Sequence, residues 1–294
     1  MAPGSTGEVV SLGGPWGSVA ASKGGALSGA VRRSSRIVGL FLIVGLMAGC
    51  AGRPGADTLT PTTATAPGVK EETILVASTR ARDPRQGTFF NGQRAPLSFA
   101  KVDMTVPPSH QAGEIEWPKT PPGNPATDMV VRDSAYLNGQ KQFVADLNAE
   151  LAKRPKGQRR VFIFVHGYNT EFSEALYRQA QLMADSDSEA VPVLFTWASA
   201  ANTVEYVYDN NSATIARDAL LETLHLVLNS NADQVSLLAH SMGNWVTMEA
   251  LRQYKLVGKP APIGKLGDLT LADPDIDIDV FKEQMRTIGK PRKP

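Results

Sequence analysis

The segment Ala239-His-Ser-Met-Gly243 contains the residues best suited to nucleophilic chemistry. A serine between small residues at the junction of a strand and a helix matches a nucleophile elbow, with Ala239 in place of the first glycine. Small residues are needed there because larger side chains would collide with the strand and helix. We expect Ser241 to act as a nucleophile, the alternative being a small residue in a tight turn. His240 and Gly243 are interpreted as residues that shape this turn.

A second motif, His166-Gly-Tyr-Asn169, directly follows the apolar run of residues 161–165. Acyl transfer through a serine needs two N–H donors directed at the developing oxyanion. We expect these donors to be the backbone amides of Tyr168 and of Met242, the residue after the candidate nucleophile. His166 is interpreted as a structural residue that shapes the loop together with Gly167, and not as a group that accepts protons.

Both motifs follow buried strands within a regular alternation of strands and helices. This pattern predicts βαβ units and an α/β fold, with helices on both faces of a mostly parallel sheet. The buried strands are expected at residues 161–165, 191–197, 234–238 and 269–272, and the helices at 139–153, 171–184, 211–229 and 243–255. Three further strands are expected upstream, at residues 73–78, 98–106 and 114–117.

Four sequence blocks resemble a known family: Phe164-Val-His-Gly-Tyr-Asn169, Leu194-Phe-Thr-Trp-Ala-Ser199, Leu238-Ala-His-Ser-Met-Gly-Asn244 and Leu271-Ala-Asp-Pro-Asp-Ile-Asp277. They are similar to a bacterial group of α/β-hydrolases of unknown function, which includes exported lipoproteins and is related to esterases and lipases. The resemblance covers roughly residues 72–285. It implies hydrolysis of an acyl ester or a related bond, without a metal or a cofactor.

The acid and the base of a catalytic triad are harder to assign. The family orders its triad as Ser, then an acid, then His, but the sequence has no histidine after Ser241. Asp273 is the best candidate for the acid, and a loop or cap residue is the alternative. His225 is interpreted as a packing residue, and His110 lies in a proline-rich loop. Only a short segment follows Leu271, and a βαβ unit takes about 30 residues, so we expect an incomplete domain in which this strand is an exposed edge.

The alternating acids Asp273, Asp275, Asp277 and Asp279 also allow a calcium interpretation. The segment lacks the glycine and the distal glutamate of an EF-hand loop. An acid-rich start of a helix explains the pattern equally well. We therefore expect no metal and no cofactor.

The N-terminal part has the layout of a secretory signal. Arg32, Arg33 and Arg36 precede an apolar run that ends at Cys50, as in a signal peptide. The ending Leu46-Met-Ala-Gly-Cys50 resembles a bacterial lipobox, which implies that Cys50 carries lipid after cleavage. We then expect a lipoprotein anchored to the membrane of a bacterial cell envelope, facing the periplasm or the exterior.

The chain is accordingly divided into four parts. Residues 1–30 are a low-complexity extension, with Val31 as an alternative start, and residues 31–49 are the signal peptide. Residues 50–71, rich in Pro and Thr, are a flexible tether, and residues 72–294 form the hydrolase domain.

Composition narrows the function further. The net charge of +1 gives no basic footprint for nucleic acid, and a single cysteine excludes an internal disulfide framework. The sequence therefore predicts a serine hydrolase of the esterase or lipase type, acting on a small-molecule or lipid ester, with doubtful turnover because no histidine follows the serine. The alternative is a non-catalytic envelope lipoprotein that uses the hydrolase pocket for binding.

Overall fold

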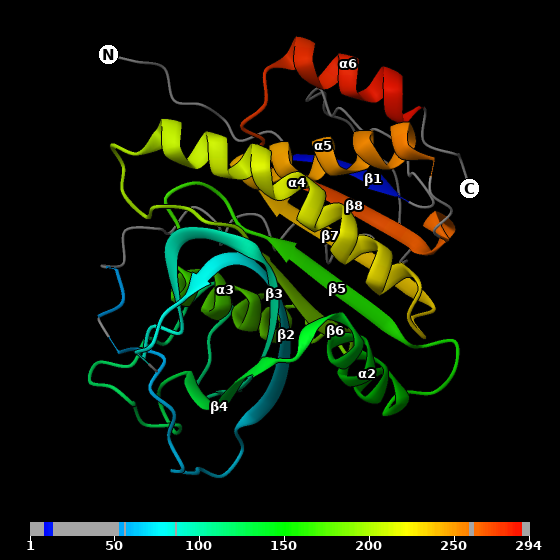
Figure 1. Cartoon of the computed structure of the whole chain (residues 1–294). Helices are drawn as coiled ribbons and strands as arrows, with labels where there is room; N and C mark the ends of the chain where they lie inside the picture. The colour runs from blue at the N-terminus through cyan, green and yellow to red at the C-terminus, as the bar shows by residue number, and fades with distance from the viewer. Residues whose placement is uncertain (1–8, 14–52, 56, 86, 259–261, 290–294) are drawn as a thin grey trace, which may run out of the picture.

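The computed structural model describes residues 9–13, 53–55, 57–85, 87–258 and 262–289. Cys50 and the expected signal segment lie outside these residues. Within them the chain forms an eight-stranded sheet in the order β1-β8-β7-β5-β6-β2-β3-β4 (Figure 1). The strands are β1 (Val9–Gly13), β2 (Lys70–Arg82), β3 (Phe90–Val106), β4 (Val130–Leu137), β5 (Arg160–Val165), β6 (Val191–Thr196), β7 (Gln234–His240) and β8 (Leu266–Ala272).

Five adjacent strands, β8, β7, β5, β6 and β2, run parallel to one another. The strands β1, β3 and β4 are antiparallel to their neighbours. The helices are α2 (Gly139–Ala152), α3 (Phe172–Asp185), α4 (Tyr206–Leu228), α5 (Met242–Val257) and α6 (Ile278–Ile288), with a short 3₁₀ helix at Ile263–Lys265. This arrangement confirms the predicted α/β fold with a mostly parallel sheet.

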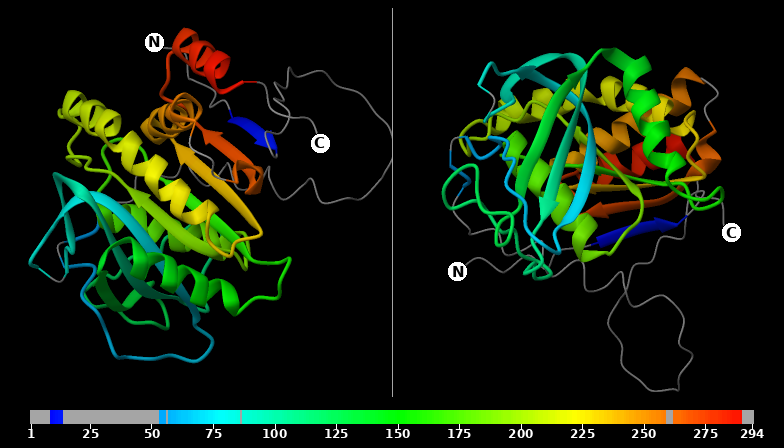
Figure 2. Two further views of the ribbon diagram at one scale, coloured as in Figure 1. Left: turned by 45° about the vertical axis from the view of Figure 1, so that its right-hand side comes forward. Right: turned by 90° about the horizontal axis from the view of Figure 1, so that it is seen from below.

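Helices cover the sheet on both faces, as buried parallel strands require. Side chains of α2, α4 and α5 pack on one face, whereas α3 packs on the other (Figures 1 and 2). Each residue of β6 is buried, in keeping with its continuous apolar sequence. No helix within the described residues combines the length and apolar character required to cross a bilayer.

The strand β8 is not the exposed edge that the sequence predicted. β1 pairs with it in antiparallel register, Leu12 opposite Leu269 and Val10 opposite Leu271. Residues 9–13 come from the segment interpreted as a low-complexity extension. A neighbour on each side satisfies the backbone groups of β8, which removes the expected unpaired edge.

The predicted tether also needs correction, because residues 57–62 pack against the domain. Leu59 is only 2% exposed and joins the apolar cluster under α3. Its amide donates to the Gly87 carbonyl at 3.1 Å, and the Thr62 amide donates to the Val131 carbonyl at 3.0 Å. Buried apolar area and backbone hydrogen bonds hold this segment in place.

Two strand predictions upstream were inaccurate. Residues 114–117 form no strand, and the ring of Trp117 instead stacks on Tyr177 of α3 with centroids 4.5 Å apart. The strand β4 was missed because its burial alternates along an edge of the sheet, with no continuous apolar run. Neither difference alters the parallel strands on which the candidate motifs lie.

Candidate functional site

Ser241 lies at the sharp turn between β7 and α5, at the carboxyl edge of the sheet. Its backbone has φ 50° and ψ −125°, a conformation that is strained for a residue with a side chain. The turn is held by hydrogen bonds from the Ser241 amide to the Ala272 carbonyl at 3.0 Å and from the Asn244 side chain to the Ser241 carbonyl at 2.8 Å. Ordinary backbone contacts therefore maintain a strained serine at the position where open α/β sheets bind ligands.

Two glycines allow the loop after β5 to lie directly on this turn. A Cβ atom at Gly167 would lie 2.8 Å from the Ser241 Cβ, and one at Gly243 would lie 2.5 Å from the His166 carbonyl oxygen. Real Cβ atoms essentially never approach so closely. The two sequence motifs are thus in contact, and glycine is the residue that permits the contact at each position.

The backbone amides of the loop after β5 and of the first residue of α5 fall into two groups, those that donate to a protein acceptor and those that do not. The Asn169 amide donates to Asp209 and the Thr170 amide to the Ser199 hydroxyl, each at 3.0 Å. Within the described part of the chain, the amides of Tyr168 and Met242 donate to no protein acceptor. An unpaired N–H group needs a water or ligand acceptor. Met242 directly follows the serine, and Tyr168 directly follows Gly167, which lies against the serine.

His166 is buried and held by contacts on both ring nitrogens. Its Nε2 accepts the Trp197 amide at 3.1 Å, which leaves Nδ1 to donate to the Gly167 carbonyl at 2.8 Å. Burial, reinforced by the charge of Arg80, lowers the pKa of His166 well below its usual 6.5. The neutral ring also stacks on the Trp197 indole. These contacts fit a residue that shapes the loop.

His240 directly precedes Ser241 in the chain, and Asp273 directly follows Ala272, whose carbonyl accepts the Ser241 amide. The ring of His240 lies beside Gly167, where a Cβ would be 2.9 Å from its Nδ1. Burial lowers the pKa of His240, while the charge of Asp273 acts in the opposite direction. Asp273 follows β8 with φ 44°, and the amide of Asp275 lies 3.4 Å from the Ser241 carbonyl oxygen.

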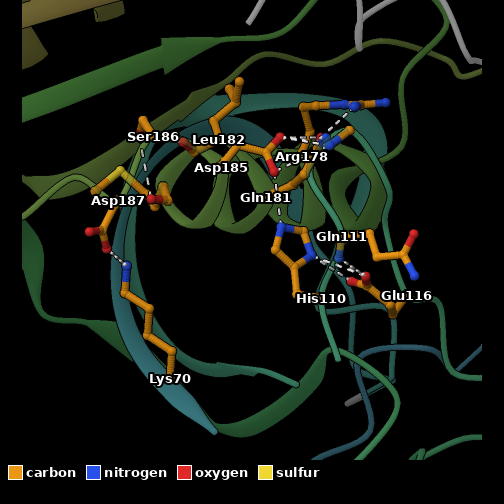
Figure 3. A network of polar contacts seen from close by, with 12 residues as sticks. Lys70, His110, Gln111, Glu116, Arg178, Gln181, Leu182, Asp185, Ser186 and Asp187 are labelled. Carbon is orange, nitrogen blue, oxygen red and sulfur yellow. Dashed lines mark hydrogen bonds and ion pairs between the residues drawn. The ribbon is translucent and has the colours of Figure 1, made fainter. Parts of the chain in front are cut away.

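The remaining histidines are engaged elsewhere. His110 bridges two carboxylates, with Nδ1 2.9 Å from Glu116 and Nε2 2.9 Å from Asp185 of α3 (Figure 3). His225 packs its ring edge against Tyr254 near the end of α4, about 28 Å along the helix from its first residue. In the part of the chain that the structure describes, no imidazole hydrogen-bonds the Ser241 hydroxyl.

The acidic segment after β8 starts a helix. Asp277 caps α6, and its carboxylate accepts the amides of Asp279 at 2.9 Å and Val280 at 3.2 Å. Among the described residues, no group of three His, Cys, Asp or Glu side chains is arranged to hold a metal ion. The helix interpretation of these acids therefore fits the structure.

Two cavities lie beside the loops after β5 and β6. One, of about 310 Å³, is lined by residues that include Arg80, Glu171 and Ser199. The other, of about 720 Å³, is lined by Asn169, Thr203 and Arg53, whose guanidinium donates to the Asn169 carbonyl at 2.7 Å. Neither cavity includes Ser241 in its lining, and of the loop at residues 166–170 only Asn169 lines one of them, the larger cavity.

Sequence reasoning missed two buried charged residues beneath these loops, Asp209 and Arg80, which are 0% and 1% exposed. An acid in the first turn of a helix is usually a surface residue that faces the helix dipole. Arg80 follows the apolar part of β2, where a basic residue normally marks a strand end. No local signal distinguishes them, because their partners lie far away in the sequence.

A sequence model of a protein family, described as alpha/beta hydrolase of unknown function (DUF900), matches residues 140–294. The match includes the loop after β5, the Ser241 turn and the acidic segment after β8. No curated protein and no solved structure matches the chain.

Proposed function

The chain belongs to the alpha/beta hydrolase family of unknown function (DUF900), and from that premise we propose that it cleaves an acyl ester through Ser241, as esterases and lipases do. The observation that carries this proposal is the strained backbone of Ser241, at φ 50°, in a turn that lies against Gly167. Among the described residues, the adjoining amides of Met242 and Tyr168 donate to no protein acceptor. Ser241 is half-buried at the carboxyl edge of the sheet, from which its hydroxyl would attack a carbonyl carbon. The amides of Tyr168 and Met242 can then receive the negative charge that develops on the carbonyl oxygen.

In the proposed reaction, the Ser241 oxygen forms a bond to the acyl carbon as its proton passes to a general base. As the tetrahedral intermediate collapses, the bond to the leaving oxygen breaks and the base returns the proton to it, so that an alcohol departs. The acyl-enzyme that remains is then hydrolysed by water. Asp273 is the proposed acid of the site. No described imidazole contacts the Ser241 hydroxyl, so we expect slow turnover of ordinary esters, while a strongly electrophilic probe still reacts.

Apolar side chains beside the site support a small-molecule or lipid ester as the substrate. Val204 and Val207 are 79% and 73% exposed, and Tyr206 lies between them in the sequence. The Tyr206 ring packs edge-on against Tyr168 at 5.3 Å, and its hydroxyl donates to Asp275 at 3.0 Å. An apolar rim joined to the candidate oxyanion loop favours an acyl chain over a charged ligand. Lipidation at Cys50 would hold this rim near a membrane of the cell envelope.

A second candidate function is binding without catalysis, in an envelope lipoprotein that uses the same pocket. The absence of an imidazole contact at Ser241 among the described residues is the observation that favours it. Under this alternative, the free amides of Tyr168 and Met242 would hold a carboxylate or carbonyl group of a ligand.

Reaction with a fluorophosphonate probe separates the two functions. We expect covalent labelling of the wild-type chain and loss of labelling in Ser241→Ala, with retention in Ser236→Ala, a control on the same strand. A mass shift on the peptide containing Ser241 would locate the adduct. Equal labelling of Ser241→Ala and wild type would place the nucleophile elsewhere, and no labelling of any form would favour the binding function.

A further inference from the structure

The carboxylate of Asp209 collects backbone amides from two separate loops. One oxygen, Oδ2, accepts the Asn169 amide at 3.0 Å from the loop after β5. The other, Oδ1, accepts the Ala200 amide at 2.6 Å from the loop after β6. Carboxylates that receive several N–H groups form strong, charge-assisted hydrogen bonds. A single side chain at the start of α4 thus fixes both loops.

The hydroxyl of Ser199 extends this contact. It donates to Asp209 at 2.6 Å and accepts the amides of Thr170 at 3.0 Å and Ala201 at 3.1 Å. Together, the carboxylate and the hydroxyl therefore accept four backbone amides, two consecutive ones from each loop: Asn169 and Thr170, and Ala200 and Ala201. The orientation of the Ser199 hydroxyl is determined by Asp209, because its single proton points toward the carboxylate.

Arg80 contacts the same loops through their acceptors. Its guanidinium donates to the Thr170 carbonyl at 2.7 Å and to the Ser199 carbonyl at 3.1 Å, and its Nε donates to the Thr196 hydroxyl at 2.8 Å. One Nη atom also lies 3.4 Å from Nε2 of His166. Amides are thus held by the anion and carbonyls by the cation.

The charges of Asp209 and Arg80 stabilise each other electrostatically although the two side chains form no direct ion pair. Within the described residues, Arg80 forms no ion pair, although it is fully buried. Burial lowers the pKa of Arg80 to about 10, and the charge of Asp209 is the largest effect opposing this shift. Arg80 therefore remains charged at neutral pH, and the removal of either residue leaves a buried charge without compensation.

We infer that Asp209 and Arg80 act as one unit that holds the loop after β5 in the position where the Tyr168 amide faces the reaction site at Ser241. This inference rests on the proposed function. The anchored Asn169 amide belongs to the peptide plane that follows Tyr168, and Asn169 has a positive φ of 55°. Because peptide planes are rigid, only the dihedral angles of Tyr168 separate the anchored plane from the plane of the Tyr168 N–H.

The test uses the full chain and two readouts, hydrogen exchange of residues 166–171 and the rate of fluorophosphonate labelling. In Asp209→Asn, one of the accepting oxygens becomes an NH₂ group that faces a donor. We expect faster exchange in the loop and labelling slowed by about 10-fold to 100-fold, less than the 10²–10³ for complete loss of an oxyanion donor. Thr223→Val, which removes a buried hydroxyl in the same helix, should change neither readout.

Two further variants test the coupling. Arg80→Met should slow labelling as Asp209→Asn does, and the double variant should be no more than about 3-fold slower than the worse single variant, because residues that act as a unit are non-additive. Ser199→Ala keeps both charges and removes only the hydroxyl, so it serves if Asp209→Asn does not fold, with a smaller effect in the same direction.

Each outcome decides the inference. Unchanged loop exchange in Asp209→Asn would overturn it, as would faster exchange with unchanged labelling or fully additive effects in the double variant. Retained labelling in Ser241→Ala would instead overturn the proposed function, and loop exchange would still report on the anchoring of residues 166–171.

Discussion

Gly243 offers a direct test of the contact between the two motifs. In Gly243→Ala the new methyl group would lie 2.5 Å from the His166 carbonyl oxygen and 2.6 Å from the Val165 carbonyl oxygen. Ordinary contact begins at 3.4 Å, so the loop and α5 must separate by about 0.9 Å, the difference between 3.4 and 2.5 Å. Both acceptors are backbone atoms, and no side chain can move aside to relieve the clash.

The separation should affect stability and chemistry to different extents. Overpacking in a dense interior costs about 1–3 kcal/mol, which the better helix propensity of alanine offsets by up to about 1 kcal/mol. The displacement also moves the Met242 amide away from the loop that carries the Tyr168 amide. Misplacement by about 1 Å can reduce a rate by about 10²-fold, so we expect labelling to slow by about that factor while the protein stays folded.

The assay combines urea unfolding with the rate of fluorophosphonate labelling, and Gly264→Ala serves as the control because nothing lies within 4 Å of a Cβ at Gly264. We expect the control to match wild type in both measurements. A Gly243→Ala protein with wild-type stability and wild-type labelling would refute the reasoning, because the contact between the loop and the turn would then be looser than the structure indicates.

Three other predictions concern regions away from Ser241. Burial lowers the pKa of His110, but hydrogen bonds and charges from its two carboxylate partners raise it above 6.5 overall; the stabilisation should be complete below about pH 6.5 and disappear as pH rises through the raised pKa. In urea unfolding, the difference between wild type and His110→Gln should therefore shrink from pH 6 to pH 9, and an equal difference at both would contradict this. Leu59→Ala should cost about 2–5 kcal/mol in thermal or urea unfolding, compared with almost nothing for Leu256→Ala at an exposed position, whereas a flexible tether would give no difference. Cys50→Ala should abolish membrane association and the lipid mass on the mature N-terminus, and unchanged fractionation would exclude the proposed anchor.

Much of the fold could be predicted from the sequence because its central strands are buried on both faces. A continuous apolar run such as residues 161–165 has few other interpretations when helices alternate with it. The edges were harder to predict. β4 has an alternating pattern, and β1 is a short segment among glycines, whose pairing depends on β8 more than 250 residues away.

Residues of the candidate site could be proposed from the sequence only where they belong to a local motif. Ser241 and Tyr168 belong to short motifs with characteristic neighbours, so the sequence alone identifies them as candidates. Asp209 and Arg80 belong to no such motif, and their roles depend on a meeting of β2, α4 and two loops that only the folded chain creates. Similarly, the sequence places His110 in a loop but contains no indication that two carboxylates converge on its ring.

Because β1 pairs with β8, the proposed cleavage of the N-terminal segment would change the edge of the sheet. A cut before Cys50 would place residues 9–13 on a separate peptide, and the strand would lose the high effective concentration that covalent linkage provides. As a separate peptide, this five-residue strand would dissociate upon dilution. The precursor and the mature lipoprotein would then differ in the open edge of β8, which a strand from another polypeptide could occupy by β-augmentation.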